Sequence, residues 1–179
     1  MATRKSLPAA ARFRQRNRQF MLFLVFQVGA DRYAIEAARV IEVIAMVDLR
    51  KIAGAPVGTA GEFVYRGAPV PVLDLCSLAL GRPSNLRLST RIILLRHEPQ
   101  PGTVHPLGLI AEHATELAQK NLGEFTGVGA ALAAPDPRGR LQLLQLDRLL
   151  TPELRDLLAV YYFTQTLEPE PVGAMPRAR

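Results

Sequence analysis

Short apolar runs separated by turn-forming residues are the feature that most restricts how this chain can fold. FLVFQV (23–28) and YAI (33–35) flank a Gly-Ala-Asp-Arg turn, and this pattern predicts a hairpin. Further strands are predicted at 47–52, in a second hairpin at 63–75, and at 89–97 and 107–117. Because helical segments do not alternate with these strands, a parallel βαβ sheet is excluded. We therefore predict a mainly β fold, built as a barrel or a sandwich.

Two segments have helical spacing instead. Apolar residues recur at that spacing in EAARVIEVI (36–44), which predicts a short amphipathic helix. The sequence TPE (151–153) is typical of a helix start and predicts a helix over 152–163. We therefore expect one short helix in the first half of the chain and one helix near its end.

The positive charge of the chain is concentrated at the N-terminus. The net charge is +6, and residues 1–18 carry six Lys or Arg and no acid. The rest of the chain is near neutral and lacks the basic surface expected of a nucleic-acid-binding domain. We expect this leader to be disordered and solvated. No run approaches the roughly 18 apolar residues of a membrane span, so we expect a cytoplasmic protein without direct membrane insertion.

Side chains suited to catalysis or metal binding are sparse. His97 and His105 are expected in surface loops, and His113 has no second histidine at ligand spacing. Cys76 is the single cysteine, so no internal disulfide can form, and its apolar neighbours predict a buried, inert thiol. Asp74 ends an apolar run and is expected to cap a turn or the following helix. We predict no enzyme activity, no cofactor and no metal site.

The stretch FVYRGAPVPVLDL holds the most distinctive cation of the chain, Arg66. Gly67 beside it permits a turn with positive φ, and Gly61 permits the close approach of another backbone segment. Two interpretations of Arg66 stay open. It could form a structural ion pair with Glu62 or Asp74, or it could anchor a carboxylate or an amide-rich surface of a partner.

Five segments in the same order resemble the chemotaxis coupling-protein family, the CheW-like domain, from about residue 20 to about residue 158. FLVFQVGADRYAIEAARVIEVI is similar to the opening strand, turn and short helix of that family. TAGEFVYRGAPVPVLDL resembles its core motif, with Arg-Gly and the closing Asp-Leu at matching spacing. STRIILLRH, LGLIAEHATEL and GRLQLLQLDRLL resemble the middle strand, the Gly-x-x-Val-Asp segment and the closing strand.

This resemblance implies two small, five-stranded, SH3-like β-barrels packed around a shared apolar core, with a groove between them. Family members are non-catalytic adaptors. One implied partner is the regulatory domain of a CheA-type histidine kinase, and the other is the cytoplasmic tip of a chemoreceptor. Matched position by position, the receptor-facing residues are Val40, Glu42, Gly61 and Arg66.

The resemblance also suggests a division of the chain. It predicts a basic leader (1–19), a CheW-like domain with two sub-barrels (20–158), and the end of a C-terminal helix with a disordered tail (159–179). The alternative from another class is a small-barrel nucleic-acid-binding protein that uses the basic leader. That function requires aromatic residues interleaved with cations on a strand face, and this sequence offers little of that pattern.

The sequence departs from the family pattern at three places. Pro69 occupies a strand position and suggests an edge, because proline cannot donate to the ladder. Ala111-Glu112 replace the Val-Asp of the family, and the region before Phe125 is short, which suggests a trimmed second barrel. These departures favour an alternative pathway, such as a surface-sensing or pilus-type system.

Overall fold

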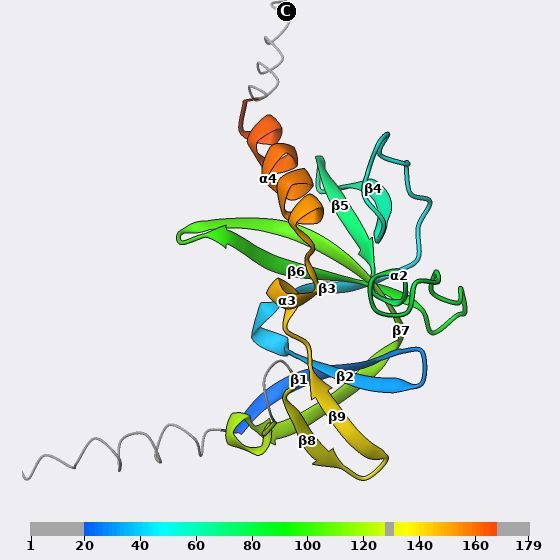
Figure 1. The fold of residues 1–179 in the computed structure, drawn as a ribbon, viewed down its shortest axis with the longest axis vertical. Coiled ribbons are helices and arrows are strands. Elements are labelled where there is room, and N and C mark those ends of the chain that lie inside the picture. The colour runs from blue at the N-terminus through cyan, green and yellow to red at the C-terminus, as the bar shows by residue number, and fades with distance from the viewer. Residues whose placement is uncertain (1–19, 128–130, 168–179) are drawn as a thin grey trace, which may run out of the picture.

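The computed structural model describes residues 20–127 and 131–167 (Figure 1). Nine strands lie within these residues: β1 (Phe20–Val28), β2 (Asp31–Glu36), β3 (Val40–Ala45), β4 (Thr59–Tyr65), β5 (Ala68–Asp74), β6 (Arg91–Gln100), β7 (Thr103–Asn121), β8 (Ala133–Asp136) and β9 (Gly139–Leu143). Short helices are η1 (Ala37–Arg39), α2 (Leu75–Leu80), η2 (Leu122–Glu124) and α3 (Leu146–Leu149), and α4 (Pro152–Leu167) is the long one. The expectations for the leader and the tail lie largely outside the described residues.

The strands form two five-stranded units that share the long strand β7, and Figure 1 shows these units one above the other. Barrel 1 has the order β3-β6-β7-β5-β4, with the first half of β7 paired to β6 and β5. Barrel 2 has the order β7-β1-β2-β9-β8 and uses the second half of β7. The predicted mainly β fold with two small sub-barrels is confirmed.

Neither barrel is closed by a full ladder within the described residues. In barrel 1 the edge strands β3 and β4 share no ladder, and one isolated bridge joins Arg50, in the loop after β3, to Glu62 on β4. In barrel 2 a single bridge joins Thr126 to Ala133 at the corresponding gap. Barrel 2 keeps five strands, although β8 and β9 are only 4 and 5 residues long. The gap between β3 and β4 is called the open seam below.

Three groups of buried apolar side chains fill the two barrels and the space between them. Barrel 1 is filled by the group around Val72 and Ile92, and barrel 2 by the group around Phe23 and Leu141. The largest group lies between the barrels and includes Leu73, Leu109 and other residues from both barrels and from the helices. Each fully buried side chain of this kind contributes roughly 1.5–3 kcal/mol through its removal from water. The expected shared core is therefore present.

Strand β7 passes from one barrel to the other through a bend at His113. This residue has a positive φ of 49°, which is uncommon for a residue other than glycine. The pairing of β1 with β7 is also irregular beside the bend, where Gln27 pairs with Glu112 and Val25 with Glu116. The strand predicted at 107–117 is thus part of one longer strand that bends at His113.

The helix predicted over 36–44 is wrong. The segment forms the three-residue turn η1 and then strand β3, which pairs with β6. Its second half, VIEVI, is rich in β-branched residues, which fit a pleated ladder better than a helix. The short helix of the first half is instead α2, and the strand predicted at 47–52 is a loop that contributes only the bridge at Arg50.

Pro69 lies at the edge of a sheet, as predicted for a residue without a backbone N–H. Strand β5 pairs with β7 only over residues 72–74, so at Pro69 the ladder runs to β4 alone. The missing N–H of proline therefore falls where β5 has a neighbouring strand on one side only.

His97 is buried, with 5% of its surface exposed, so the surface loop expected for it is wrong. Its Nδ1 atom lies 3.1 Å from the hydroxyl oxygen of Tyr162 on α4. The surface loop expected for His105 is also wrong, because this residue lies half-buried on β7 and stacks on the ring of the same tyrosine, with ring centroids 4.2 Å apart. Two histidines of barrel 1 thus contact the C-terminal helix. Local sequence patterns could not predict this contact, because α4 is far from both histidines along the chain.

Acid is expected to weaken the folded state through this cluster. Burial lowers the pKa of His97, Arg39 and His105 lower it further, and only Asp147 opposes them. An unfolded histidine has a pKa of about 6.5, so the unfolded state binds more protons and stability falls as pH drops through that value. Urea unfolding at several pH values checks this.

In that experiment His97→Gln should lose less stability between neutral and mildly acidic pH than the unsubstituted protein loses. His113→Gln is the matched control, since His113 is exposed. An identical acid response in the His97 variant and in the unsubstituted protein would contradict the assignment.

Candidate functional site

An exposed, charged corner of barrel 1 lies at the two-residue turn between β4 and β5. Tyr65 pairs with Ala68, and Arg66 and Gly67 form the turn, with φ values of 51° and 86°. Positive φ at both central residues is the geometry of a type I′ turn, which favours Asn-Gly. An L-residue with a long side chain in the left-handed region is held there at a cost of roughly 1–2 kcal/mol. An arginine at this costly position therefore suggests that its side chain makes a contact that offsets the cost.

Three side chains converge at this corner from both sides of the open seam. The Tyr65 hydroxyl donates a hydrogen bond to Oε2 of Glu42 on β3, at 2.5 Å. Nη2 of Arg66 lies 3.8 Å from the same oxygen. The Arg66 guanidinium carbon lies 5.0 Å from the Tyr65 ring centroid, within the range of a cation–π contact. We call Glu42, Tyr65 and Arg66 the corner triad.

The alternative partners of Arg66 are engaged elsewhere. Glu62 is buried, pairs with Arg50 and accepts a hydrogen bond from the Tyr161 hydroxyl on α4. Asp74 accepts hydrogen bonds from backbone groups. The Arg66 side chain stays 77% exposed, and Glu42 stays 46% exposed. Both charges are accordingly accessible to a partner.

Of the four receptor-facing residues that the sequence suggested, only two meet at this corner. Glu42 and Arg66 belong to the triad, whereas Val40 is half-buried and packs against the shared core. Gly61 is buried at a bulge of β4, with a φ of 145°. A Cβ atom there would lie 2.5 Å from the Arg50 carbonyl oxygen, so the expected close backbone approach is confirmed.

Sequence reasoning left out Tyr65, although its place in the chain gave a signal. Tyr65 directly precedes the Arg-Gly turn, and its ring packs against the interior of barrel 1. Phe63, two residues earlier on the strand, contacts the same ring edge-on with centroids 6.4 Å apart. Because side chains alternate between the two faces of β4, the rings of Phe63 and Tyr65 lie on the same face and pack against the interior of barrel 1. The Tyr65 hydroxyl reaches Glu42 across the open seam.

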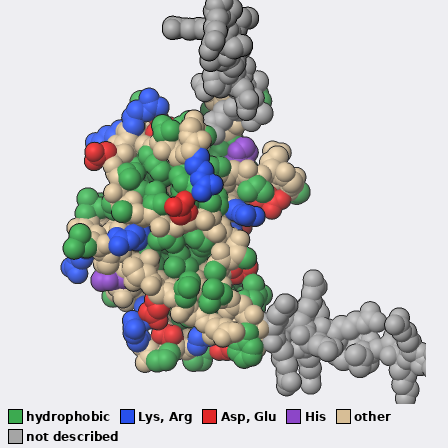
Figure 2. Space-filling model, turned by 180° about the vertical axis from the view of Figure 1, so that it is seen from behind, with side chains coloured by type: hydrophobic (Ala, Val, Ile, Leu, Met, Phe, Trp, Pro, Cys, Tyr) green, Lys and Arg blue, Asp and Glu red, His purple; other side chains and the backbone are tan. Residues whose placement is uncertain are grey.

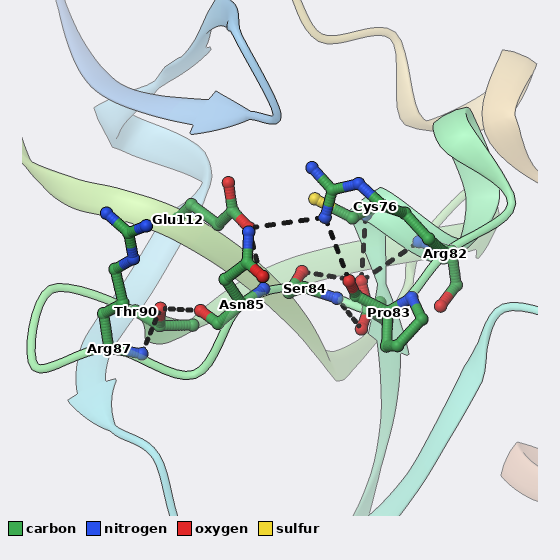
Figure 3. A network of polar contacts seen from close by, with 10 residues as sticks. Cys76, Arg82, Pro83, Ser84, Asn85, Arg87, Thr90 and Glu112 are labelled. Carbon is green, nitrogen blue, oxygen red and sulfur yellow. Dashed lines mark hydrogen bonds and ion pairs between the residues drawn. The ribbon is translucent and has the colours of Figure 1, made fainter.

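A second polar network holds the loop after α2 (Figure 3). The Asp74 carboxylate accepts from the backbone N–H groups of Cys76 and Ser77 and caps α2, which confirms the predicted cap. It also accepts from the backbone N–H and the hydroxyl of Ser84, at 2.9 and 2.7 Å. Glu112 accepts from the backbone N–H of Asn85 at 2.7 Å. These contacts therefore hold the loop in place.

The part of the chain described by the structure contains no group of three or more His, Cys, Asp or Glu that could hold a metal ion. The Cys76 thiol is buried, as expected. None of the helices described here is long and apolar enough to cross a membrane. On the face seen in Figure 2, basic and acidic side chains are interspersed around apolar ones rather than gathered in one basic area.

Comparison with known proteins identifies the chain. The family model described as CheW-like domain matches residues 22–134. No curated protein sequence matches the chain significantly. Among solved structures, the scaffolding protein TtCheW from Thermoanaerobacter tengcongensis is similar, with a TM-score of 0.65 and 19% sequence identity over 76% of this chain and 91% of that one. That likeness concerns the fold, and the family match covers more than half of the sequence. The chain belongs to the CheW-like domain family.

Proposed function

We propose that this protein couples the cytoplasmic tip of a chemoreceptor to the regulatory domain of a CheA-type histidine kinase. The family supports the coarser role of a non-catalytic chemotaxis scaffold. The basic leader and the Ala111-Glu112 departure support the finer proposal that the pathway is of a surface-sensing or pilus type.

The observation that carries the receptor half of this proposal is the accessible pair of opposite charges at the corner triad. Glu42 and Arg66 are the charged residues among those matched to the receptor side of the family, and the fold brings them together from separate strands. A planar guanidinium can contact a carboxylate or backbone carbonyls through two donors at once. Arg66 is therefore proposed to anchor the receptor hairpin.

For the kinase we propose a mostly apolar, edge-to-edge contact on barrel 1 that does not include the charged side chains of the corner triad. The open architecture leaves strand edges of the kind that pair with a neighbouring domain. A transient interface of this type buries below about 1,200 Å² in total. Purified protein should bind the regulatory domain without receptor, and an absence of binding by calorimetry at high micromolar concentration would overturn the adaptor proposal.

Arg66→Ala is expected to weaken receptor binding by about 1–3 kcal/mol, the usual range for loss of a charged anchor. Kinase binding and thermal stability should change little, because the side chain is mostly exposed. Arg66→Lys should restore only part of the affinity, since a point charge does not reproduce the planar contact. Calorimetry with both partners and a melting curve on each variant measure this.

Arg138→Ala is the matched control, because Arg138 is also exposed and paired with a carboxylate, that of Glu116 in barrel 2. Loss of both affinities together with a lower melting temperature in Arg66→Ala would assign Arg66 to the scaffold instead.

A further inference from the structure

We propose that Tyr65 is a positioning residue of the receptor-binding corner, holding Glu42 and Arg66 in one relative orientation across the open seam of barrel 1. This inference rests on the proposed function. It goes beyond the family match by assigning a role to a residue that the matched receptor positions did not include.

The first reason is the strand topology. Glu42 lies on β3 and Arg66 follows β4, and these two edge strands share no ladder in the described chain. The isolated bridge between Arg50 and Glu62 joins the middle of β4 to the loop after β3 and does not involve Glu42 or the turn. Ladder hydrogen bonds therefore do not fix the distance between Glu42 and Arg66. Side-chain contacts have to fix it.

The second reason is that Tyr65 contacts both charged groups at once. Its hydroxyl reaches Oε2 of Glu42 at 2.5 Å, and its ring supports the Arg66 guanidinium at 5.0 Å from the centroid. The direct contact between the two charges is longer, at 3.8 Å, and solvent screens exposed ion pairs. The tyrosine hydroxyl thus makes the shortest contact with the acid of the corner, and its ring contacts the base.

The third reason is that Tyr65 is anchored while its neighbours are exposed. The ring is half-buried against the interior of barrel 1, whereas Glu42 and Arg66 reach solvent. A rigid aromatic side chain loses little conformational entropy on binding and can order flexible neighbours before the partner arrives. The hydrogen bond to Glu42 also raises the pKa of Tyr65, because it stabilises the protonated form that donates to the carboxylate.

A Tyr65→Phe variant isolates the hydroxyl, because it keeps the ring and its support of Arg66. We expect receptor binding to weaken about 3–10-fold, the value of one ordinary hydrogen bond. Kinase binding and the melting temperature should stay unchanged. Tyr65→Leu should weaken receptor binding further, since it removes the ring as well. Tyr33→Phe is the matched control, as Tyr33 is a half-buried tyrosine of barrel 2.

Three further measurements distinguish this inference from a purely structural role. In a double-mutant cycle, Tyr65→Phe should have little additional effect on receptor binding in a Glu42→Gln background. In the free protein, NMR relaxation at the Arg66 Nε should show greater mobility in Tyr65→Leu than in the unsubstituted protein. In a pH titration followed by the NMR signal of a Tyr65 ring carbon, Glu42→Gln should lower the pKa of Tyr65.

These results separate the inference from the proposed function. If the unsubstituted protein fails to bind receptor but the NMR changes appear, the receptor proposal fails and the positioning geometry stands. If receptor binds and Tyr65→Phe binds equally well, with additive effects in the cycle and unchanged Arg66 mobility, the positioning role is overturned.

Discussion

Asp74→Ala is expected to lower the free energy of unfolding by about 3–5 kcal/mol, because one buried carboxylate satisfies several donors at once. The substitution removes the cap of α2 and leaves the backbone N–H groups of Cys76, Ser77 and Ser84 without their acceptor. Losing a helix cap costs about 1 kcal/mol, and each buried orphan donor costs roughly 1–3 kcal/mol. Urea unfolding of the purified variant measures the change.

The free energy of unfolding of Asp74→Asn should lie between those of the unsubstituted protein and of Asp74→Ala. An amide oxygen can still cap α2, but the amide N–H₂ would face the Ser84 backbone N–H, which now donates to Oδ2. Asp48→Ala removes the same charge from an exposed loop and should change stability by less than about 0.5 kcal/mol. A stability loss in Asp74→Ala no greater than in Asp48→Ala would show that the loop holds without this network.

Much of the fold could be predicted from local pattern, because turns and β-branched runs act over a few residues. The hairpin of β1 and β2, strand β6, and α4 follow directly from such signals. The failures involve long-range contacts. The β-branched residues of VIEVI favour a strand, but the apolar spacing within 36–44 also fits a helix, and it is the pairing with β6 that decides for strand β3. His97 likewise is buried by Tyr162, which lies on the last helix.

The candidate site divides in the same way. The Arg-Gly turn and the permissive glycine at 61 could be read from residue types, because few residues tolerate positive φ. The segment that approaches Gly61 and the hydroxyl that reaches Glu42 both depend on the arrangement at the open seam. The family resemblance supplied Glu42 and Arg66 as candidates, and only the structure joined them through Tyr65.

Gly61→Ala is expected to destabilise the protein by about 2–4 kcal/mol, through unfavourable φ and a backbone collision. The new Cβ atom would lie 2.5 Å from the Arg50 carbonyl oxygen and 3.1 Å from the Leu49 Cβ atom. The bridge between Arg50 and Glu62 leaves that backbone little room to move. Chemical unfolding and the two binding affinities, measured where the variant is still folded, test this.

Gly102→Ala separates strain from collision. Gly102 also has a positive φ, 86°, but a Cβ atom there meets nothing within 4 Å. Its replacement should therefore cost only about 1–2 kcal/mol and leave both affinities intact. We expect Gly61→Ala to weaken receptor and kinase binding together, because it displaces the bridge that joins the edges of barrel 1. If Gly61→Ala instead stays as stable as Gly102→Ala and loses receptor binding alone, then Gly61 is itself a receptor contact, as the family resemblance implied.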